Sequence, residues 1–223
     1  MRRREMLELL ADRVCALVAS CPVRVAIDGI DAAGKTILAN ELCDTLVARG
    51  RSVIYASIDG FHRPRAERYR RGASSPEGYY RDSFDYDALR AALLLPLGPG
   101  GSRGYRRSVY NYRADRPALA AEETAPPDAV LVMEGVFLLR PELADLWEYR
   151  ILVEAPFAVT LERAGRRDAE LFGSVEAARA RYLERYIPGQ RLYFEEARPQ
   201  ERADAIVRNG NPEHPKLIVR DSP

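Results

Sequence analysis

Hydrophobic residues recur along the chain at two spacings, and each spacing predicts one kind of element. Short apolar runs at 23–27, 52–58, 129–133, 149–153 and 203–207 are typical of buried strands. Apolar side chains at helical spacing cover 5–19, 37–47, 85–95 and 141–146, and Pro156 occupies the favoured first turn of a further helix. Because the strands are separated by helices, the pattern predicts an α/β fold with a mostly parallel sheet.

Polar segments interrupt this alternation. Residues 59–84 are rich in arginine and too long for a plain connection. Residues 105–112 alternate enough for a strand or hairpin at a sheet edge, and residues 163–172 are again polar and Arg-rich. Residues 175–197 form a long predicted helix with an interruption at Pro188-Gly189.

Composition excludes several classes of protein. A chain of 223 residues with 47% hydrophobic and 30% charged side chains suits one globular domain. No apolar run could span a bilayer, so we expect no membrane partner and a cytoplasmic location. The net charge of +1 argues against a dedicated nucleic-acid binder. Three cysteines and two histidines disfavour a disulfide framework, a histidine-rich metal site and a Ser-His-Asp hydrolase.

One segment matches the phosphate-binding pattern G-x-x-x-x-G-K-[ST] at every fixed position. Its residues are Gly29, Ile30, Asp31, Ala32, Ala33, Gly34, Lys35 and Thr36. An apolar strand precedes it and a helix follows, which is the context that the motif requires. Lys35 is one of only two lysines among 34 basic residues, which indicates a site where an arginine would not serve. The segment predicts ATP binding, with Thr36 as a Mg²⁺ ligand.

Two carboxylates stand where such a loop needs them. The apolar strand 130–133 ends at Glu134, which predicts a second Mg²⁺ ligand, although strands often end in an acidic residue. The strand before Gly60 ends at Asp59, which could be a turn-former or could accept a proton from a substrate hydroxyl. In open parallel sheets the carboxyl ends of strands converge on the ligand crevice, so we expect Asp59 to be the catalytic base.

The chain lacks the N-K-x-D motif of small GTPases and the L-S-G-G-Q motif of transporter ATPases, and its length is wrong for a helicase. A small-molecule kinase remains. The segments 28–36, 57–61, 134–135 and 163–168 together resemble the uridine kinase branch of the P-loop kinases, in the superfamily of phosphoribulokinase and bacterial pantothenate kinase. The resemblance covers most of the chain, from about residue 23 to residue 209.

The resemblance implies a single P-loop kinase domain over 1–223, with a five-stranded, mostly parallel sheet flanked by helices. It implies an acceptor-side insert at about 59–116, with a hairpin, and a lid at about 163–190. It also implies catalytic roles for Asp59, Lys35, Arg163 and Arg167. Phe61 or His62 would border the acceptor pocket.

Other acceptor-side residues depart from the family pattern. In the hairpin segment 110–116, which carries Tyr110 and Tyr112, Asn111 replaces an Asp and Asp115 replaces a His. Tyr79 stands where a uridine-contacting Asp is expected, with Asp82 close by, and Arg181 replaces a base-contacting Gln. The tyrosines could stack on a flat acceptor or simply pack, and Asp82 or Asp115 could accept hydrogen bonds from the hydroxyls of a ribose.

We therefore expect ATP- and Mg²⁺-dependent phosphorylation of a hydroxyl on a small molecule, with a nucleoside such as uridine as the acceptor. Other acceptors stay open, among them pantothenate, a sugar phosphate and nicotinamide riboside, as does a regulatory nucleotide-binding protein without phosphotransfer. The run of arginines in 63–71 is either a solvated face or, with Arg181, a clamp for an anionic substrate. A homo-oligomer is compatible with all of these alternatives.

Overall fold

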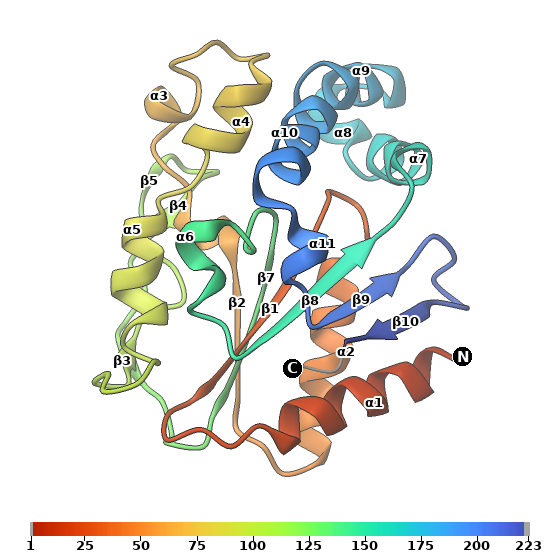
Figure 1. The fold of residues 1–223 in the computed structure, drawn as a ribbon. Coiled ribbons are helices and arrows are strands. Elements are labelled where there is room, and N and C mark those ends of the chain that lie inside the picture. The colour runs from red at the N-terminus through yellow and green to blue at the C-terminus, as the bar shows by residue number, and fades with distance from the viewer. Residues whose placement is uncertain (1, 221–223) are drawn as a thin grey trace.

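The computed structural model describes residues 2–220; residues 1 and 221–223 of the predicted domain lie outside the described part. Six strands form the main sheet, in the spatial order β10-β9-β8-β1-β7-β2 (Figure 1). They are β1 (Val23–Gly29), β2 (Val53–Ser57), β7 (Val130–Gly135), β8 (Tyr149–Glu154), β9 (Ala205–Arg208) and β10 (Lys216–Val219). All neighbours pair in parallel except β10, which runs antiparallel to β9. The predicted α/β fold with a mostly parallel sheet is confirmed.

The five predicted strands are all present, and β10 is an addition. This strand at the edge of the sheet has only four residues, which alternate between exposed and half-buried. An edge strand that buries so little carries a weak hydrophobic pattern, and this is why the sequence does not reveal it.

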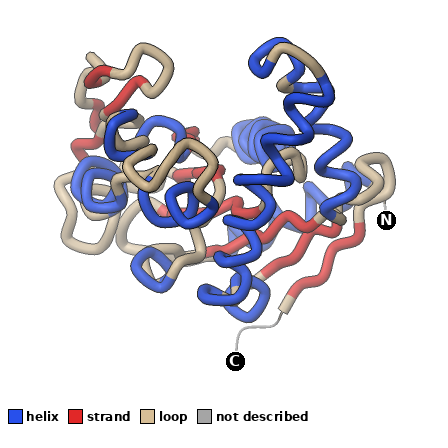
Figure 2. The backbone as a smooth tube through the Cα atoms, turned by 90° about the horizontal axis from the view of Figure 1, so that it is seen from above, coloured by secondary structure: helices blue, strands red, loops and turns tan. Residues whose placement is uncertain are grey.

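Alternate residues of each strand face opposite sides of the sheet, and both sides are covered. Val25 and Ile27 pack in a core with helices α1 (Arg3–Ala16) and α2 (Lys35–Ala48). Ala26 faces the other core, which includes residues of α4 (Pro76–Asp82) and α10 (Ile187–Ala197). Seen from above, helices lie on both sides of the strands (Figure 2). A sheet buried on both faces explains the near-continuous apolar runs of the central strands.

Two helical groups follow the carboxyl ends of strands β2 and β8, and parts of both rise above the sheet (Figure 1). The insert group follows β2 and consists of η1 (Ile58–Phe61), α3 (Arg65–Arg68), α4, α5 (Tyr86–Leu89) and η2 (Arg90–Leu94). The lid group follows β8 and consists of α7 (Phe157–Arg167), α8 (Ala169–Phe172), α9 (Val175–Arg181), η3 (Tyr182–Tyr186) and α10. The remaining helices are α6 (Pro141–Ala144) and α11 (Pro199–Arg202).

Short ladders complete the insert. β4 (Tyr110–Asn111) pairs with β5 (Arg116–Pro117) as the predicted hairpin, and β3 (Gly104–Tyr105) pairs with β6 (Glu123–Thr124). The long helix predicted at 175–197 is present, but its irregularity is a π-helical turn, η3, that lies just before Pro188. No helix within residues 2–220 has the length and apolarity needed to cross a membrane.

Candidate functional site

The phosphate loop joins β1 to α2 through a backbone that only certain residues can adopt. Gly29 has φ +151°, and a Cβ at this position would lie 2.3 Å from the carbonyl oxygen of Val153. Gly34 has φ +101° at the start of α2. Lys35 is buried, and its Nζ donates a hydrogen bond of 2.9 Å to the carbonyl oxygen of Ile30, across the loop. The ammonium group and the N-terminus of α2 are therefore directed toward the same small space, as anion binding requires.

The two predicted metal ligands lie side by side. Oγ1 of Thr36 donates to Oε2 of Glu134 at 3.3 Å, and the hydroxyl of Tyr55 donates to Oε1 of Glu134 at 3.4 Å. Glu134 is 7% exposed, at the end of β7. A hydroxyl and a carboxylate beside a phosphate-binding loop form an oxygen-only donor set that suits Mg²⁺, which usually takes few ligands from the protein and others from substrate phosphates.

Asp59 lies in η1, directly after β2. Its backbone N–H donates to Oγ of Ser57, and 56% of its side chain is accessible to solvent at the open side of the site. Desolvation on the protein side and the negative charges of Glu134 and Asp31 raise the pKa of the Asp59 carboxyl to about 6. A carboxyl group with a pKa of about 6 is mostly deprotonated at physiological pH, and it is a stronger base than an ordinary aspartate.

His62, rather than Phe61, reaches the surface next to Asp59. Phe61 is fully buried in the core, so it cannot border a pocket as the sequence suggested. Nδ1 of His62 lies 3.2 Å from the carbonyl oxygen of Asp59, and its ring stacks on Tyr112 at a centroid distance of 4.5 Å. Burial lowers the pKa of His62 to about 4, so the imidazole is neutral and acts as part of an aromatic wall.

Tyr79 supports the phosphate loop instead of forming an open wall. Its hydroxyl donates to Oδ2 of Asp31 at 2.7 Å, and Nε2 of Gln190 donates to the same oxygen at 2.6 Å. Tyr79 belongs to the insert and Gln190 to α10 of the lid group. Asp31 therefore connects both groups to the phosphate loop, and Gln190 is a contributor that the sequence analysis missed.

The predicted acceptor-side carboxylates are already engaged. Asp82 is 4% exposed at its side chain and binds Arg70 at 2.6 Å and Arg71 at 2.8 Å. These contacts leave little of Asp82 accessible to an acceptor, because both oxygens are occupied.

Asp115 is more open but also has several partners. It accepts from the backbone N–H of Arg65 at 2.8 Å and from the hydroxyl of Tyr110 at 3.0 Å, and it lies 3.5 Å from Arg68. Hydrogen bonds from these donors lower the pKa of Asp115. The hairpin therefore uses Asp115 to hold α3.

The two predicted lid arginines do different things. Nη2 of Arg163 donates to the carbonyl oxygens of Asn209 and Gly210, and Asn209 donates in turn to Ala33 in the phosphate loop at 2.7 Å. Arg163 thus positions the loop after β9.

Arg167 makes a two-pronged ion pair with Asp168, at 2.8 and 2.9 Å, and also donates to the hydroxyl of Tyr182. The pKa of Arg167 is raised by hydrogen bonding to Asp168 and, more weakly, by the charge of Asp31. The charge of Arg167 also lowers the pKa of Asp59 slightly, so the two side chains interact electrostatically although no hydrogen bond joins them in the described part of the chain.

Arg181 lies between lid and insert. Its guanidinium donates to the carbonyl oxygen of Ala73 and to Oγ of Ser74, and it lies 5.9 Å from the ring centre of Tyr186. Arg181 is thus held by the insert and has no carboxylate partner within residues 2–220.

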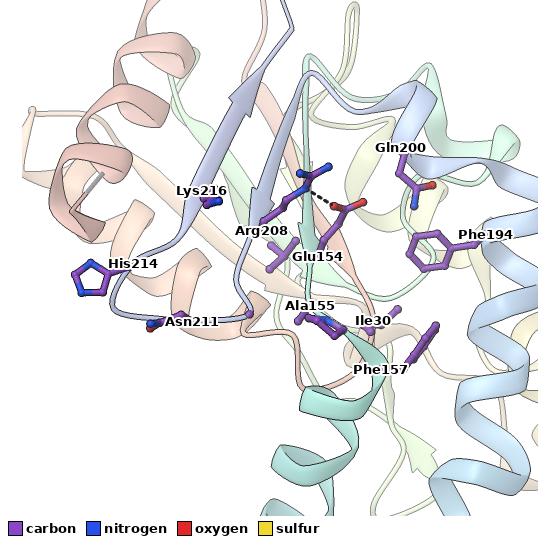
Figure 3. Close-up of a pocket in the computed structure, with 13 residues that line it drawn as sticks. Ile30, Glu154, Ala155, Phe157, Phe194, Gln200, Arg208, Asn211, His214 and Lys216 are labelled. Carbon is purple, nitrogen blue, oxygen red and sulfur yellow. Dashed lines mark hydrogen bonds and ion pairs between the residues drawn. The ribbon is translucent and has the colours of Figure 1, made fainter.

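A cavity of about 710 Å³ adjoins the phosphate loop at Ile30 and was not foreseen (Figure 3). Phe157 and Phe194 provide apolar surface, while Glu154 and Arg208 form an ion pair of 3.4 Å. The contributing residues come from the ends of β8 and β9 and from α10, far apart in the sequence. The pattern Asn-Gly-Asn-Pro at 209–212, directly after a strand, is the one sequence feature that points to this place.

A buried carboxylate, Asp28, stands behind the loop. It accepts from the backbone N–H of Gly29 at 2.7 Å, from that of Leu139 at 3.3 Å and from the hydroxyl of Tyr193. Burial raises the pKa of Asp28. Asp28 therefore joins the phosphate loop to the segment after β7 and to α10. These contacts hold the loop next to the end of β7, where Glu134 lies.

Comparisons with known proteins agree with this geometry. No protein-family model matches the chain. The uridine kinase of Oceanobacillus iheyensis is 24% identical over 207 residues, which are 90% of this chain and 93% of that protein. The uridine kinase of Lactobacillus johnsonii is 25% identical over 192 residues, 85% of this chain and 87% of that protein.

Solved structures show the same fold. A "possible uridine kinase" from Bacillus stearothermophilus superposes with a TM-score of 0.71 at 23% identity, over 91% of this chain and 97% of that one. D-glycerate 3-kinase from Cryptococcus neoformans superposes with a TM-score of 0.63 at 14% identity, over 96% and 99%. The chain has the P-loop kinase fold, and its predicted resemblance to uridine kinase-like P-loop kinases is confirmed.

Proposed function

We propose that this protein is an ATP- and Mg²⁺-dependent kinase that phosphorylates a hydroxyl group of a small molecule. The observation that carries the proposal is the position of Asp59. A carboxylate with a pKa of about 6 stands at the same edge of the sheet as a complete phosphate loop and feels the charges of both Lys35 and Glu134. This combination suits phosphoryl transfer and has no use in simple nucleotide binding.

The phosphates of ATP would lie on the loop amides and on Lys35. Thr36 and Glu134 would hold the Mg²⁺ ion, which supplies positive charge that offsets the charge of the phosphates. Arg167 adds a guanidinium from the lid side. The nucleoside of ATP fits the cavity beside Ile30, where Phe157 and Phe194 provide flat apolar surface.

In the transfer step, the acceptor oxygen forms a bond to the γ-phosphorus while the bond between that phosphorus and the bridging oxygen breaks. The products are the phosphorylated acceptor and ADP. The hydroxyl proton passes to the carboxylate of Asp59, which later releases it to solvent. Lys35 and Arg167 stabilise the charge on the transferred group.

The uridine kinases among the relatives favour a nucleoside such as uridine as the acceptor. Its flat base could lie against the aromatic wall of His62 and Tyr112. A charged acceptor is the second candidate, because arginines line the cavity between insert and lid.

The test is acceptor-dependent release of ADP from MgATP by the purified protein, with a panel of nucleosides, sugars, sugar phosphates and hydroxy acids. We expect at least one acceptor to stimulate ADP release, and Lys35→Ala to abolish the stimulation. Tight ATP binding without turnover on any acceptor would instead identify a regulatory nucleotide-binding protein.

A further inference from the structure

A second cavity, of about 730 Å³, opens between the insert and the lid. We call it the insert–lid cavity; its lining includes Arg65 and Tyr69 from α3 and its end, and Phe172, Arg181 and Glu184 from the lid group. Glu184 is the one acidic side chain in this lining, against two arginines.

Arg65 is exposed, and its charge has no carboxylate partner. Within residues 2–220 its guanidinium makes no hydrogen bond or ion pair and lies 5.7 Å from the ring centre of Tyr69. Arg181 binds a backbone carbonyl and a hydroxyl, neither of which neutralises it. Two guanidiniums without carboxylate partners thus line one cavity, which is an arrangement that favours an anionic ligand.

The wall behind the cavity is positive too. Arg185 is almost fully buried, and it binds only carbonyl oxygens, those of Gly72, Ala73, Ser75 and Arg68. Its guanidinium lies 4.8 Å from the ring centre of Tyr69, and that of Arg68 lies 5.7 Å from it. Asp115, near Arg68, is the only carboxylate that pairs with either of them in the described part of the chain. In and behind the lining, the four positive side chains Arg65, Arg68, Arg181 and Arg185 therefore outnumber the two carboxylates Glu184 and Asp115.

Contacts connect this cavity to the candidate base. Asp59 lies against His62, and His62 stacks on Tyr112. The carbonyl oxygen of Tyr112 accepts from Arg68 at 3.4 Å, and Arg68 packs on Tyr69 in the cavity lining. An acceptor whose hydroxyl is at Asp59 could therefore extend along this aromatic and cationic wall into the cavity.

We infer that the acceptor carries an anionic group, a carboxylate or a phosphate, in addition to the hydroxyl that is phosphorylated, and that Arg65 and Arg181 bind this group in the insert–lid cavity. The inference rests on the proposed kinase function and chooses the second candidate, a charged acceptor, over the neutral nucleoside that the names of the relatives favour. The ion pairs of Asp82 with Arg70 and Arg71 agree with this inference, because they leave Asp82 unable to bind the hydroxyls of a neutral sugar.

The experiment uses matched pairs of acceptors that differ in one anionic group. Glycerate and glycerol test a carboxylate, ribose 5-phosphate and ribose test a phosphate, and uridine represents the neutral nucleosides. Acceptor-dependent ADP release is measured for the wild-type protein at low and high salt. We expect turnover only with a charged member of a pair, with a KM that rises with ionic strength.

Three variants then assign the group to its site. Arg65→Gln removes a side chain without internal hydrogen bonds, so folding should be intact, and we expect KM for the charged acceptor to rise about tenfold or more while kcat changes little. Arg181→Gln should act in the same direction, and Glu184→Gln should lower KM. Arg4→Gln is the matched control. The exposed side chain of Arg4 makes no hydrogen bond or ion pair to residues 2–220. Its helix, α1, lies at the end of the molecule opposite the insert and the lid group (Figure 1).

The possible outcomes distinguish a failure of this inference from a failure of the proposed kinase function. If uridine is the best acceptor and its KM is the same in Arg65→Gln and Arg181→Gln as in the wild type, the anionic acceptor is wrong and the kinase proposal stands. If a charged acceptor is used with a KM that neither variant changes, the assignment to this cavity is wrong. If no acceptor stimulates ADP release, both proposals fall.

Discussion

At the scale of single residues, the site depends on chemical types that close substitutes do not reproduce. Lys35 is the clearest case, because the chain uses arginine for 32 of its 34 basic residues. Its ammonium is a compact charge that folds back over the loop to Ile30. A planar guanidinium needs more room and directs its donors in a fixed fork.

We therefore expect Lys35→Arg to lose most of its activity, in addition to the full loss in Lys35→Ala. The physical reason is shape, since both lysine and arginine carry one positive charge at neutral pH. Steady-state ADP release, together with MgATP affinity from calorimetry, measures the effect. Near-normal turnover in Lys35→Arg would contradict the argument.

Asp59 predicts a pH dependence. Its carboxyl has a raised pKa of about 6 and must be deprotonated to accept the hydroxyl proton. The kinase rate should therefore rise as the pH increases through about 6 and level off above it. Asp59→Asn should bind MgATP normally, lose this rise and reduce kcat by about 10² or more. If Asp59→Asn instead loses Mg²⁺ or ATP binding and keeps kcat, Asp59 is a metal ligand.

At the scale of elements, the lid group has a well-held part and a loosely held part. α10 is held by hydrogen bonds from Gln190 to Asp31 and from Tyr193 to Asp28. In contrast, α8 has no buried residue, and Leu171 at its end is 76% exposed. We therefore expect the short helix α8 to be the part of the lid group that moves most readily when ligands bind.

We expect amide hydrogen exchange at about 163–173 to be fast in the free protein and to slow when MgATP and acceptor are both bound. Closure excludes water, which would otherwise hydrolyse ATP. Exchange measured by mass spectrometry gives the readout, with α2 as an internal reference. Identical exchange at 163–173 with and without ligands would show that this segment is no lid.

Sequence could predict the elements and the phosphate loop because both follow from local patterns. The runs that become β1, β2, β7, β8 and β9 are apolar enough to be recognised one by one. The partners of Asp31 could not be predicted, since Tyr79 and Gln190 lie 48 and 159 positions away and only the fold brings them together. The ion pairs of Asp82 with Arg70 and Arg71 could not be predicted either. From the sequence we expected Asp82 to be available to an acceptor.

At the scale of the whole molecule, insert and lid are joined above the sheet by Arg185. Its guanidinium collects the carbonyl oxygens of the loop 72–75, and the ring of Tyr69 covers it. Carbonyl oxygens that are removed from water need hydrogen-bond donors. The guanidinium of Arg185 supplies donors to several carbonyl oxygens at once.

Arg185→Met should lower the free energy of unfolding by about 2–4 kcal/mol, because it leaves the buried carbonyl oxygen of Arg68 and three partly buried carbonyl oxygens without this donor. Chemical denaturation monitored by circular dichroism measures the loss. Arg4→Met is the control and should change the stability by less than about 0.5 kcal/mol. An equally small change in Arg185→Met would mean that water replaces the arginine without cost.

The shared oxygen of Asp31 has a consequence for how the two substrates bind. Because this oxygen accepts hydrogen bonds from Tyr79 of the insert and from Gln190 of the lid group, we expect a ligand that orders one group to affect the other, and the binding of MgATP and of the acceptor to be cooperative. The coupling factor is the ratio by which one ligand changes the affinity of the other. Thermodynamic linkage makes it the same in both directions, so MgATP must tighten acceptor binding by as much as the acceptor tightens MgATP binding. Tyr79→Phe keeps the ring and removes the link, so we expect this factor, measured by calorimetry in both orders of addition, to fall about fivefold. An unchanged factor in Tyr79→Phe would place the communication between the two substrates elsewhere.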